Sequence, residues 1–156
     1  MKKIFLMLLL AASMSISAFA QKISADKVPS SVSSTFKGKF SNATKINWEM
    51  EKAEYEANFT LKGEEVSATF DKTGKWLETE TVIKISALPT AIQQALKKDF
   101  ANFKVNEASK IESVKNGNSF EAEVEKGEET FDVLFAPDGK VINQTKTEKE
   151  KDEKKD

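Results

Sequence analysis

The chain of 156 residues contains no cysteine, no histidine and no arginine, so every basic side chain is a lysine. Without cysteine it forms no disulfide, and its fold depends on the burial of apolar side chains. Transition-metal sites built on imidazole or thiolate ligands are excluded, as are Ser-His-Asp and Cys-His nucleophile pairs. Carboxylate and Ser-Lys chemistry stay open, but no spacing favours either. We therefore predict no enzyme activity, no catalytic residue, no metal site and no cofactor.

Long apolar runs are also missing after the first residues. Residues 1–20 contain Lys2 and Lys3, an apolar run from Ile4 to Ala12 and the small-residue ending Ala18-Phe19-Ala20. These are the three parts of a secretory signal peptide cleaved before Gln21. The run is shorter than the roughly 20 residues of a transmembrane helix. We expect a periplasmic or secreted protein with no membrane insertion after cleavage.

Lysines form no concentrated basic stretch in the mature chain, which is weakly acidic. Loss of Lys2 and Lys3 leaves 22 basic against 25 acidic side chains, a net charge of about −3. Because nucleic-acid binding depends on a concentrated basic face, this balance argues against a nucleic-acid partner. A mature chain of about 136 residues is long enough to bury about two thirds of its unfolded surface.

Two stretches of the chain are similar in the order of their apolar residues and turns. The first runs from Val28-Pro29 to Gly74-Lys75, and the second from Leu88-Pro89 to Gly139-Lys140. Both contain a Lys-Gly-Glu-Glu turn, and such self-similarity indicates a tandem repeat. We expect a signal peptide at 1–20, a first repeat at 21–86 and a second at 87–145. Residues 146–156 have no apolar side chain and are expected to be a disordered charged tail.

Each repeat is predicted to start with one amphipathic helix, because proline followed by apolar residues four apart is a helix-start signal. The apolar period then changes to two, which indicates half-buried antiparallel strands. Trp48 shares its phase with Ile46 and Met50 and is expected in the core. The phase of strand 75–85 and the structure of 104–115 are ambiguous. The predicted fold is α+β, with two tandem repeats of one helix followed by a four-stranded antiparallel sheet, the sheets continuous and both helices on one face.

The chain resembles the PepSY-like, β-lactamase-inhibitor-protein-like (BLIP-like) domains of exported bacterial proteins. The features that carry the likeness are the exported start, the Val28-Pro29 and Leu88-Pro89 helix openings, the glutamate-rich hairpins and the Asp-containing turns at 71–75 and 137–140. The resemblance covers roughly 24–145. It implies tandem helix-plus-sheet units that present an extended antiparallel sheet suited to gripping a protein or peptide, and it supplies no catalytic motif.

Polar side chains on the predicted open face are the first candidates for a binding site. They are Glu54, Glu56, Asn58, Glu121, Glu123 and, on the same phase, Glu125. They could attract a basic peptide or loosely collect Ca²⁺, but residues two apart on a strand are nearly 7 Å apart and diverge. A solvated face that resists aggregation is therefore the favoured interpretation.

Trp76 is the other candidate, because large aromatic rings are common interface anchors. Leu77 must point the opposite way, so one of the two lies near solvent. The favoured function is a non-enzymatic exported module that captures an unknown protein or peptide on the open sheet face or at a sheet edge. The alternative is a carrier for a small apolar ligand in a pocket between helix and sheet. A purely structural role in the cell envelope is a third reading, and the oligomeric state is open.

Overall fold

The structure, a computed structural model, describes residues 21–147, so the predicted signal peptide and residues 148–156 of the predicted tail lie outside it. Lys146 and Thr147, assigned to the tail from the sequence, belong to the last strand. The strands are β1 (Gln21–Ile23), β2 (Thr44–Glu51), β3 (Glu54–Leu61), β4 (Glu64–Asp71), β5 (Trp76–Ile83), β6 (Lys104–Ser113), β7 (Gly117–Lys126), β8 (Glu129–Phe135) and β9 (Val141–Thr147). The helices are η1 (Ala25–Lys27), α1 (Ser30–Lys39), η2 (Ile85–Ala87) and α2 (Thr90–Asp99).

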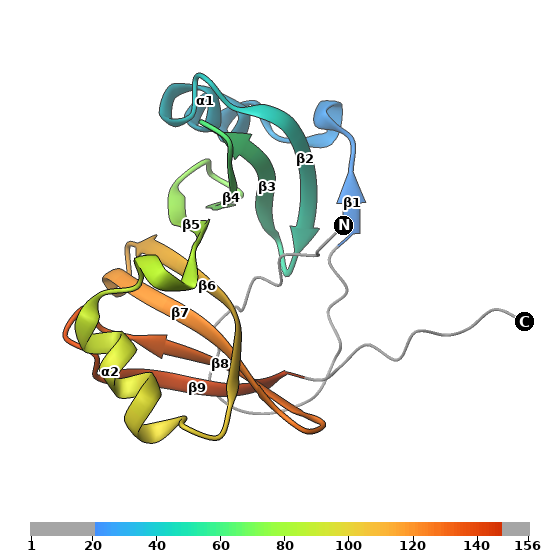
Figure 1. Cartoon of the computed structure of the whole chain (residues 1–156). Coiled ribbons are helices and arrows are strands. Elements are labelled where there is room, and N and C mark those ends of the chain that lie inside the picture. The colour runs from blue at the N-terminus through green and yellow to red at the C-terminus, as the bar shows by residue number, and fades with distance from the viewer. Residues whose placement is uncertain (1–20, 148–156) are drawn as a thin grey trace, which may run out of the picture.

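The predicted fold class, an α+β fold of two repeats of one helix followed by a four-stranded antiparallel sheet, is wrong. Within residues 21–147, nine strands form one antiparallel sheet in chain order with only two α-helices, so the fold is mainly β (Figure 1). β5 pairs with β6 from Glu78↔Ser113 to Ile83↔Ala108, which joins the halves through main-chain hydrogen bonds. This pairing leaves neither β5 nor β6 as an exposed sheet edge. β1, which the sequence did not predict, adds a ninth strand beside β2.

Both α-helices begin directly after a proline, as the sequence predicted. Pro29 and Pro89 occupy the positions before Ser30 and Thr90, where a missing N–H leaves no helical hydrogen bond unmade. Each helix buries apolar residues four apart, because one face of a helix repeats every 3.6 residues. Among the described residues, no helix has the length and apolar character needed to cross a membrane.

Each helix closes one hydrophobic core against its neighbouring strands. In the first core, the Phe36 ring contacts those of Trp48 and Phe59 with centroids 5.1 Å apart in both pairs. The sequence-based placement of Trp48 in the core is confirmed, since the residue is only 8% exposed. The second core is less aromatic and consists of Leu88, Ile92, Leu96, Phe100, Ala108, Ala122, Val124, Val133 and Phe135.

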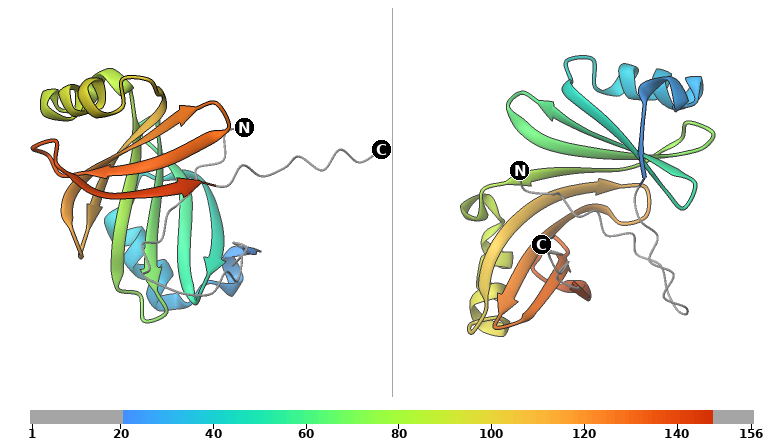
Figure 2. Two further views of the ribbon diagram at one scale, coloured as in Figure 1. Left: turned by 90° about the horizontal axis from the view of Figure 1, so that it is seen from below. Right: turned by 90° about the vertical axis from the view of Figure 1, so that its right-hand side faces the viewer.

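The two cores lie on the same face of the sheet. Ala68, in the first core, pairs with Thr79 on β5, and Ile83 shares the phase of Thr79 and pairs with Ala108 in the second core. Residues directly opposite each other in a sheet point to the same side. Figure 2 shows that the sheet bends between its halves, with α1 and α2 on the outer side. The opposite face is therefore turned to the inside of the bend.

Two glycine turns hold the helices against the sheet. Gly74 has φ +88°, and a Cβ placed on it would lie 2.7 Å from the carbonyl carbon and oxygen of Ser31 at the start of α1. Gly139 makes the equivalent close approach to Ala91 in α2. Only glycine combines positive φ with so short a backbone contact at little strain.

A bulge in β2 overturns one predicted side-chain phase. Ile46 is 43% exposed and does not join Trp48 in the core. The pairing of β2 with β3 shifts register between Thr44 and Asn47, and Lys45 lies between them with φ +54°. An extra residue in one strand reverses the alternation locally.

Candidate functional site

The face of the sheet opposite the helices carries a row of acidic side chains from neighbouring strands. We call it the acidic face and define it by Glu56 on β3, Glu78 and Glu80 on β5, Glu107 on β6, Glu121 and Glu123 on β7, and Asp132 on β8. Strand alternation places them there, because their chain neighbours, such as Ala57 and Val133, point into the cores.

The centre of the acidic face is buried rather than solvated. Glu56 is 7% exposed, Glu80 4% and Asp132 6%. The expectation of a solvated, aggregation-resisting glutamate face is therefore wrong at its centre. Acidic side chains two apart on one strand diverge from each other. Acidic side chains on neighbouring strands, in contrast, converge on the inner side of the bent sheet.

Burial and mutual repulsion raise the pKa values of several carboxyl groups on this face. Burial, reinforced by the charges of Glu49 and other acids, raises the pKa of Glu56 from 4.5 to about 7. Burial also raises the pKa of Glu78 to about 7, with a contribution from Glu54 and a partial offset from Lys115. A carboxylate loses hydration when it is buried, so its neutral form is favoured.

The strongest effects fall on two residues that face each other across β6. Burial raises the pKa of Glu80 to about 8, although a hydrogen bond with the Ser109 side chain favours the ionised form. Burial, followed by the charges of Glu80 and Asp132, raises the pKa of Glu121 to about 9. The charges of Glu78, Glu56 and Glu107 add to the effect of burial on Glu80.

No lysine lies directly across the sheet from these acids. Thr69 and Ser113 flank Glu78, Ser67 and Ile111 flank Glu80, Ser109 and Leu134 flank Glu121, and Glu107 and Asp132 flank Glu123. An ion pair on the outer side joins Lys146 to Glu129. The acidic face thus gathers carboxyl groups from five strands without a lysine directly opposite the residues named above.

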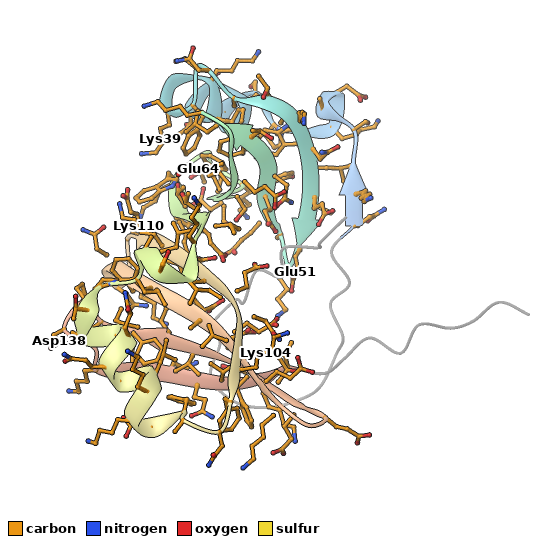
Figure 3. The ribbon with its side chains drawn as sticks, in the orientation of Figure 1. Lys39, Glu51, Glu64, Lys104, Lys110 and Asp138 are labelled. Atoms are coloured by element: carbon orange, nitrogen blue, oxygen red, sulfur yellow. The ribbon has the colours of Figure 1, made fainter. Side chains whose placement is uncertain are left out.

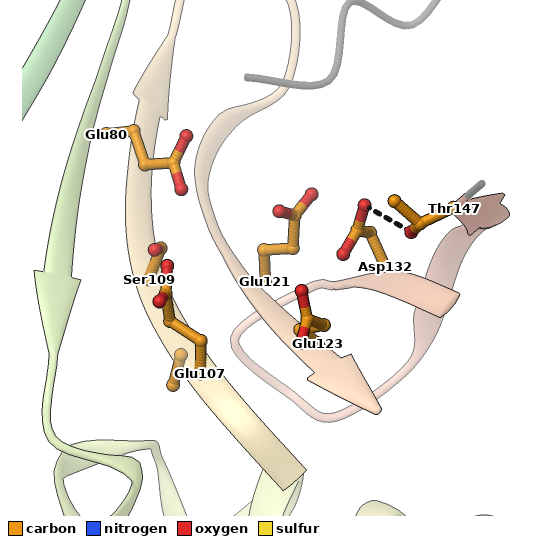
Figure 4. Close-up of a pocket in the computed structure, with 8 residues that line it drawn as sticks. Glu80, Glu107, Ser109, Glu121, Glu123, Asp132 and Thr147 are labelled. Atoms are coloured by element: carbon orange, nitrogen blue, oxygen red, sulfur yellow. Dashed lines mark hydrogen bonds between the residues drawn. The ribbon is translucent and has the colours of Figure 1, made fainter. Parts of the chain in front are cut away.

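A small pocket opens in the C-terminal half of the acidic face. It has a volume of about 80 Å³ and is lined by Glu80, Glu107, Ala108, Ser109, Glu121, Glu123, Asp132 and Thr147. Figure 4 shows the carboxyl groups of Glu80, Glu121 and Asp132 projecting from three strands on the same side of the sheet. The Thr147 hydroxyl donates a 3.0 Å hydrogen bond to Asp132. Within residues 21–147, no group of acidic side chains has the arrangement of a metal site.

The residues predicted from the sequence divide between the two faces. Glu121 and Glu123 line the pocket, whereas Glu56 and Asn58 lie on the same face in the N-terminal half. Glu54 lies at the end of this face, opposite Asp71, and partial burial raises its pKa, with Glu51 adding to the effect.

Trp76 lies on the other side of the sheet. It pairs with Phe70 and packs against the first core, and its indole N–H donates a 2.8 Å hydrogen bond to the Thr79 hydroxyl. The ammonium of Lys39, marked in Figure 3 near the end of α1, lies 4.3 Å from the centre of the ring. Trp76 is therefore a partly buried residue on the helix side, away from the glutamates.

Sequence reasoning missed four residues of the acidic face: Glu78, Glu80, Glu107 and Asp132. Glu78 and Glu80 lie on a strand whose phase was ambiguous, because threonines rather than large apolar residues alternate with them. Glu107 follows a bulge in β6 at Val105. Asp132 could have been found, since it alternates with Phe131 and Val133.

Comparison with known proteins gives one family. The family described as "Putative beta-lactamase-inhibitor-like, PepSY-like" matches residues 14–66 and 53–143. No curated protein matches the chain.

Several solved structures share the fold. A BLIP-like protein from Bacteroides fragilis NCTC 9343 is 27% identical with a TM-score of 0.69, over 80% of this chain and 89% of that one. A DUF2874 family protein from Bacteroides ovatus ATCC 8483 is 23% identical with a TM-score of 0.72, over 78% and 89%. A structure from Bacteroides eggerthii DSM 20697, described among "putative periplasmic proteins", is 24% identical with a TM-score of 0.71, over 76% and 88%. The family match covers most of the chain, so the protein belongs to the PepSY-like, beta-lactamase-inhibitor-like family.

Proposed function

We propose that this protein is an exported, non-enzymatic binding module that captures a protein or peptide on the acidic face of its sheet. Export is supported by the signal-like residues 1–20 and by the periplasmic description of a protein with the same fold. An open antiparallel sheet offers a partner both side-chain contacts and backbone hydrogen bonds at its edges.

The observation that carries the proposal is the burial of several carboxyl groups together on the acidic face, among them Glu56 and Glu80, which have no lysine directly opposite them. Burial of a carboxyl group without a cationic partner destabilises the folded state when the group ionises. Serine or threonine at Glu56 and Glu80 would fill the same strand positions without this penalty. Residues that oppose stability in this way are concentrated at functional sites. A complementary positive surface on a partner would remove the penalty.

The titration behaviour favours binding over catalysis. An acid–base pair needs one protonated and one ionised group, whose pKa values are pushed apart by their surroundings. On the acidic face, the pKa values of Glu56, Glu78, Glu80 and Glu121 all move upward. The pocket of about 80 Å³ is also smaller than the roughly 300 to 1,000 Å³ of typical small-molecule sites.

The pocket also fails to match the carrier hypothesis. A carrier for an apolar ligand would place its cavity between helix and sheet, yet the pocket lies on the opposite face and is lined mainly by carboxyl groups. In the first core, the rings of Phe36 and Phe40 pack against Phe59 and occupy the space under α1.

Affinity capture from an envelope extract tests the proposal. The full chain is compared with Glu80→Gln/Glu121→Gln, which removes two carboxyl groups from the acidic face at constant shape. Glu64→Gln/Glu128→Gln is the matched control, because it makes the same two replacements at exposed positions beside hairpin turns. We expect a defined partner to be retained by the wild-type and control chains and lost from the acidic-face variant. Retention by all three chains, or by none, would contradict capture on this face.

A further inference from the structure

We infer that the bend of the sheet is a pH-sensitive hinge, which is closed at acidic pH and opens at alkaline pH as Glu80 and Glu121 on its inner side become charged. The inference goes beyond the proposed function, because it concerns the free protein and needs no partner. It depends on three features of the described residues: two separate cores, apolar and acidic side chains packed together inside the bend, and two buried hydroxyl groups without hydrogen-bond partners.

The two cores let each half of the sheet move as a unit. The first half ends with β5 and the second starts with β6, and the cores closed by α1 and α2 have no residue in common. Both cores lie on the outer side, and Figure 1 shows α1 above and α2 below the junction of β5 with β6. The angle between neighbouring strands varies widely among sheets that keep their hydrogen bonds. The bend can therefore open at this junction without disrupting either core.

Apolar side chains inside the bend favour the closed form. Ile111 on β6 is 5% exposed and Leu134 on β8 is 7% exposed, yet they belong to neither core. Ile111 lies directly opposite Glu80, and Leu134 lies directly opposite Glu121, so both point to the inner side of the sheet. Opening the bend would return these two side chains to water, which costs free energy.

Glu80 opposes the closed form when it is ionised. It is 4% exposed between Ser67 and Ile111, neither of which carries a charge. A hydrogen bond with the Ser109 side chain favours the ionised form, but burial outweighs it and raises the pKa of Glu80 to about 8. Three other acids raise this pKa further by their charge: Glu78 on the same strand, Glu56 on β3 and Glu107 on β6. Opening the bend would hydrate the carboxylate and separate it from the second half.

Glu121 is subject to repulsion from both halves. Burial raises its pKa to about 9, and the charges of four other acids add to the effect: Glu80 and Glu78 on β5, Glu107 on β6 and Asp132 on β8. Glu123, on the same strand, lines the same pocket. Because Glu78 and Glu80 belong to the first half, their repulsion with Glu121 acts across the hinge. Separation of the halves would reduce it.

Two buried hydroxyl groups give an observation that is independent of charge. Ser67 is 1% exposed and Ser119 is fully buried, and neither Oγ has a hydrogen-bond partner. Ser67 lies opposite Glu80, and Ser119 lies opposite Ile111, so these residues form one cross-strand row through the junction of β5 with β6. A buried hydroxyl without a partner has lost its hydration and gained no hydrogen bond in return. Water entering an opened bend would satisfy both groups.

The direction of the switch follows from proton binding. In the closed form, the pKa values of Glu80 and Glu121 are about 8 and about 9, whereas a solvated glutamate has a pKa of 4.5. The closed form therefore binds more protons than the open form, and its advantage falls as the pH rises from 4.5 to about 9. Because two groups lose protons on opening, the transition should be narrower than the roughly two pH units that a single titrating group needs.

A distance measurement across the sheet tests the hinge. Lys22 on β1 and Gln144 on β9 are exposed residues on the first and last strands. Spin labels on Lys22→Cys/Gln144→Cys attach only at these two positions, because the chain has no cysteine of its own. Double electron–electron resonance should give a longer distance at pH 9 than at pH 5, and the shorter distance should return when the pH is lowered. The same distance at both pH values would overturn the inference.

A second labelled pair distinguishes opening from unfolding. Lys22→Cys/Ser34→Cys places both labels in the first half, on β1 and on an exposed position of α1. The distance between these labels should not change between pH 5 and pH 9, because the hinge moves the first half as a unit. An increase within this pair would mean that the half itself unfolds, and it would contradict the hinge.

Glutamine variants of the labelled chain identify the groups that drive the opening. Glu80→Gln/Glu121→Gln keeps the side-chain shapes but cannot ionise, so its distance from Lys22→Cys to Gln144→Cys should stay at the closed value at pH 9. Glu64→Gln/Glu128→Gln makes the same replacements at exposed positions and should open like the unmodified labelled chain. The amide NMR spectrum at pH 5 verifies that each variant is folded. Opening of the inner-side variant at the same pH as the control would show that these carboxyl groups do not operate the hinge.

Discussion

Replacing Glu56 with glutamine should stabilise the protein at neutral and alkaline pH, but much less at acidic pH. The pKa of Glu56 is about 7 in the folded protein and near 4.5 when the side chain is solvated. Between these values the folded state binds more protons than the unfolded state, so the free energy of unfolding falls as pH rises. The loss begins near pH 4.5 and is complete above pH 7.

The size of the effect follows from the same two pKa values. A shift from 4.5 to about 7 corresponds to about 3 kcal/mol in full, of which about 2 kcal/mol is lost between pH 5 and pH 8. Glu56→Gln removes this contribution, because the amide does not titrate and keeps the side-chain shape. The variant should therefore gain about 2 kcal/mol relative to wild type as the pH is raised from 5 to 8.

Urea denaturation at several pH values between 5 and 8 measures this difference. Glu65→Gln is the matched control, because Glu65 has the same strand phase as Ser67 on the same face but is exposed at the end of β4. Its free energy of unfolding should follow that of wild type at every pH. Parallel wild-type and Glu56→Gln profiles would refute the conclusion that Glu56 is held protonated by burial.

Three further predictions concern the packing of the helices and Trp76. Gly74→Ala should destabilise the fold by more than about 1 kcal/mol beyond Gly63→Ala in chemical denaturation, because both glycines have positive φ but only Gly74 lies against Ser31. Equal effects would mean that the turn is free to move away from α1. Trp48→Ala should cost about 3 to 5 kcal/mol, as buried aromatic truncations do, and a loss below about 1 kcal/mol would contradict its place in the core. Trp76→Ala should lower stability but leave capture on the acidic face unchanged in the extract assay, and loss of the partner from this folded variant would return Trp76 to the binding site.

Local patterns were enough to predict several parts of the fold. Helix starts at Pro29 and Pro89 follow from proline chemistry, and the burial of Trp48 follows from strand alternation next to a hairpin. These features depend on residues close in sequence. Ile46 shows the limit, because the bulge beside it depends on how β2 pairs with β3 and leaves no clear sign in the local alternation.

The character of the acidic face could be predicted only in part. The positions of Glu56, Glu121 and Glu123 on the polar side follow from the period of two. Their burial does not, because it depends on how far the sheet bends and on which strands become neighbours. Two glutamates on one strand diverge, whereas Glu80, 41 positions before Glu121 in the sequence, raises the pKa of Glu121 across β6.

By itself, the amino-acid sequence determined which side chains are available and which side of each clearly phased strand is polar. It also determined the family, since the family likeness depends on the order of helix starts and turns, which are short motifs of neighbouring residues. Only the tertiary structure decided how β5 and β6 pair to join the strands of both halves into one sheet. The bend of that sheet turns its polar side inward, so side chains that solvent would keep ionised are buried together, and desolvation with mutual repulsion raises their pKa values.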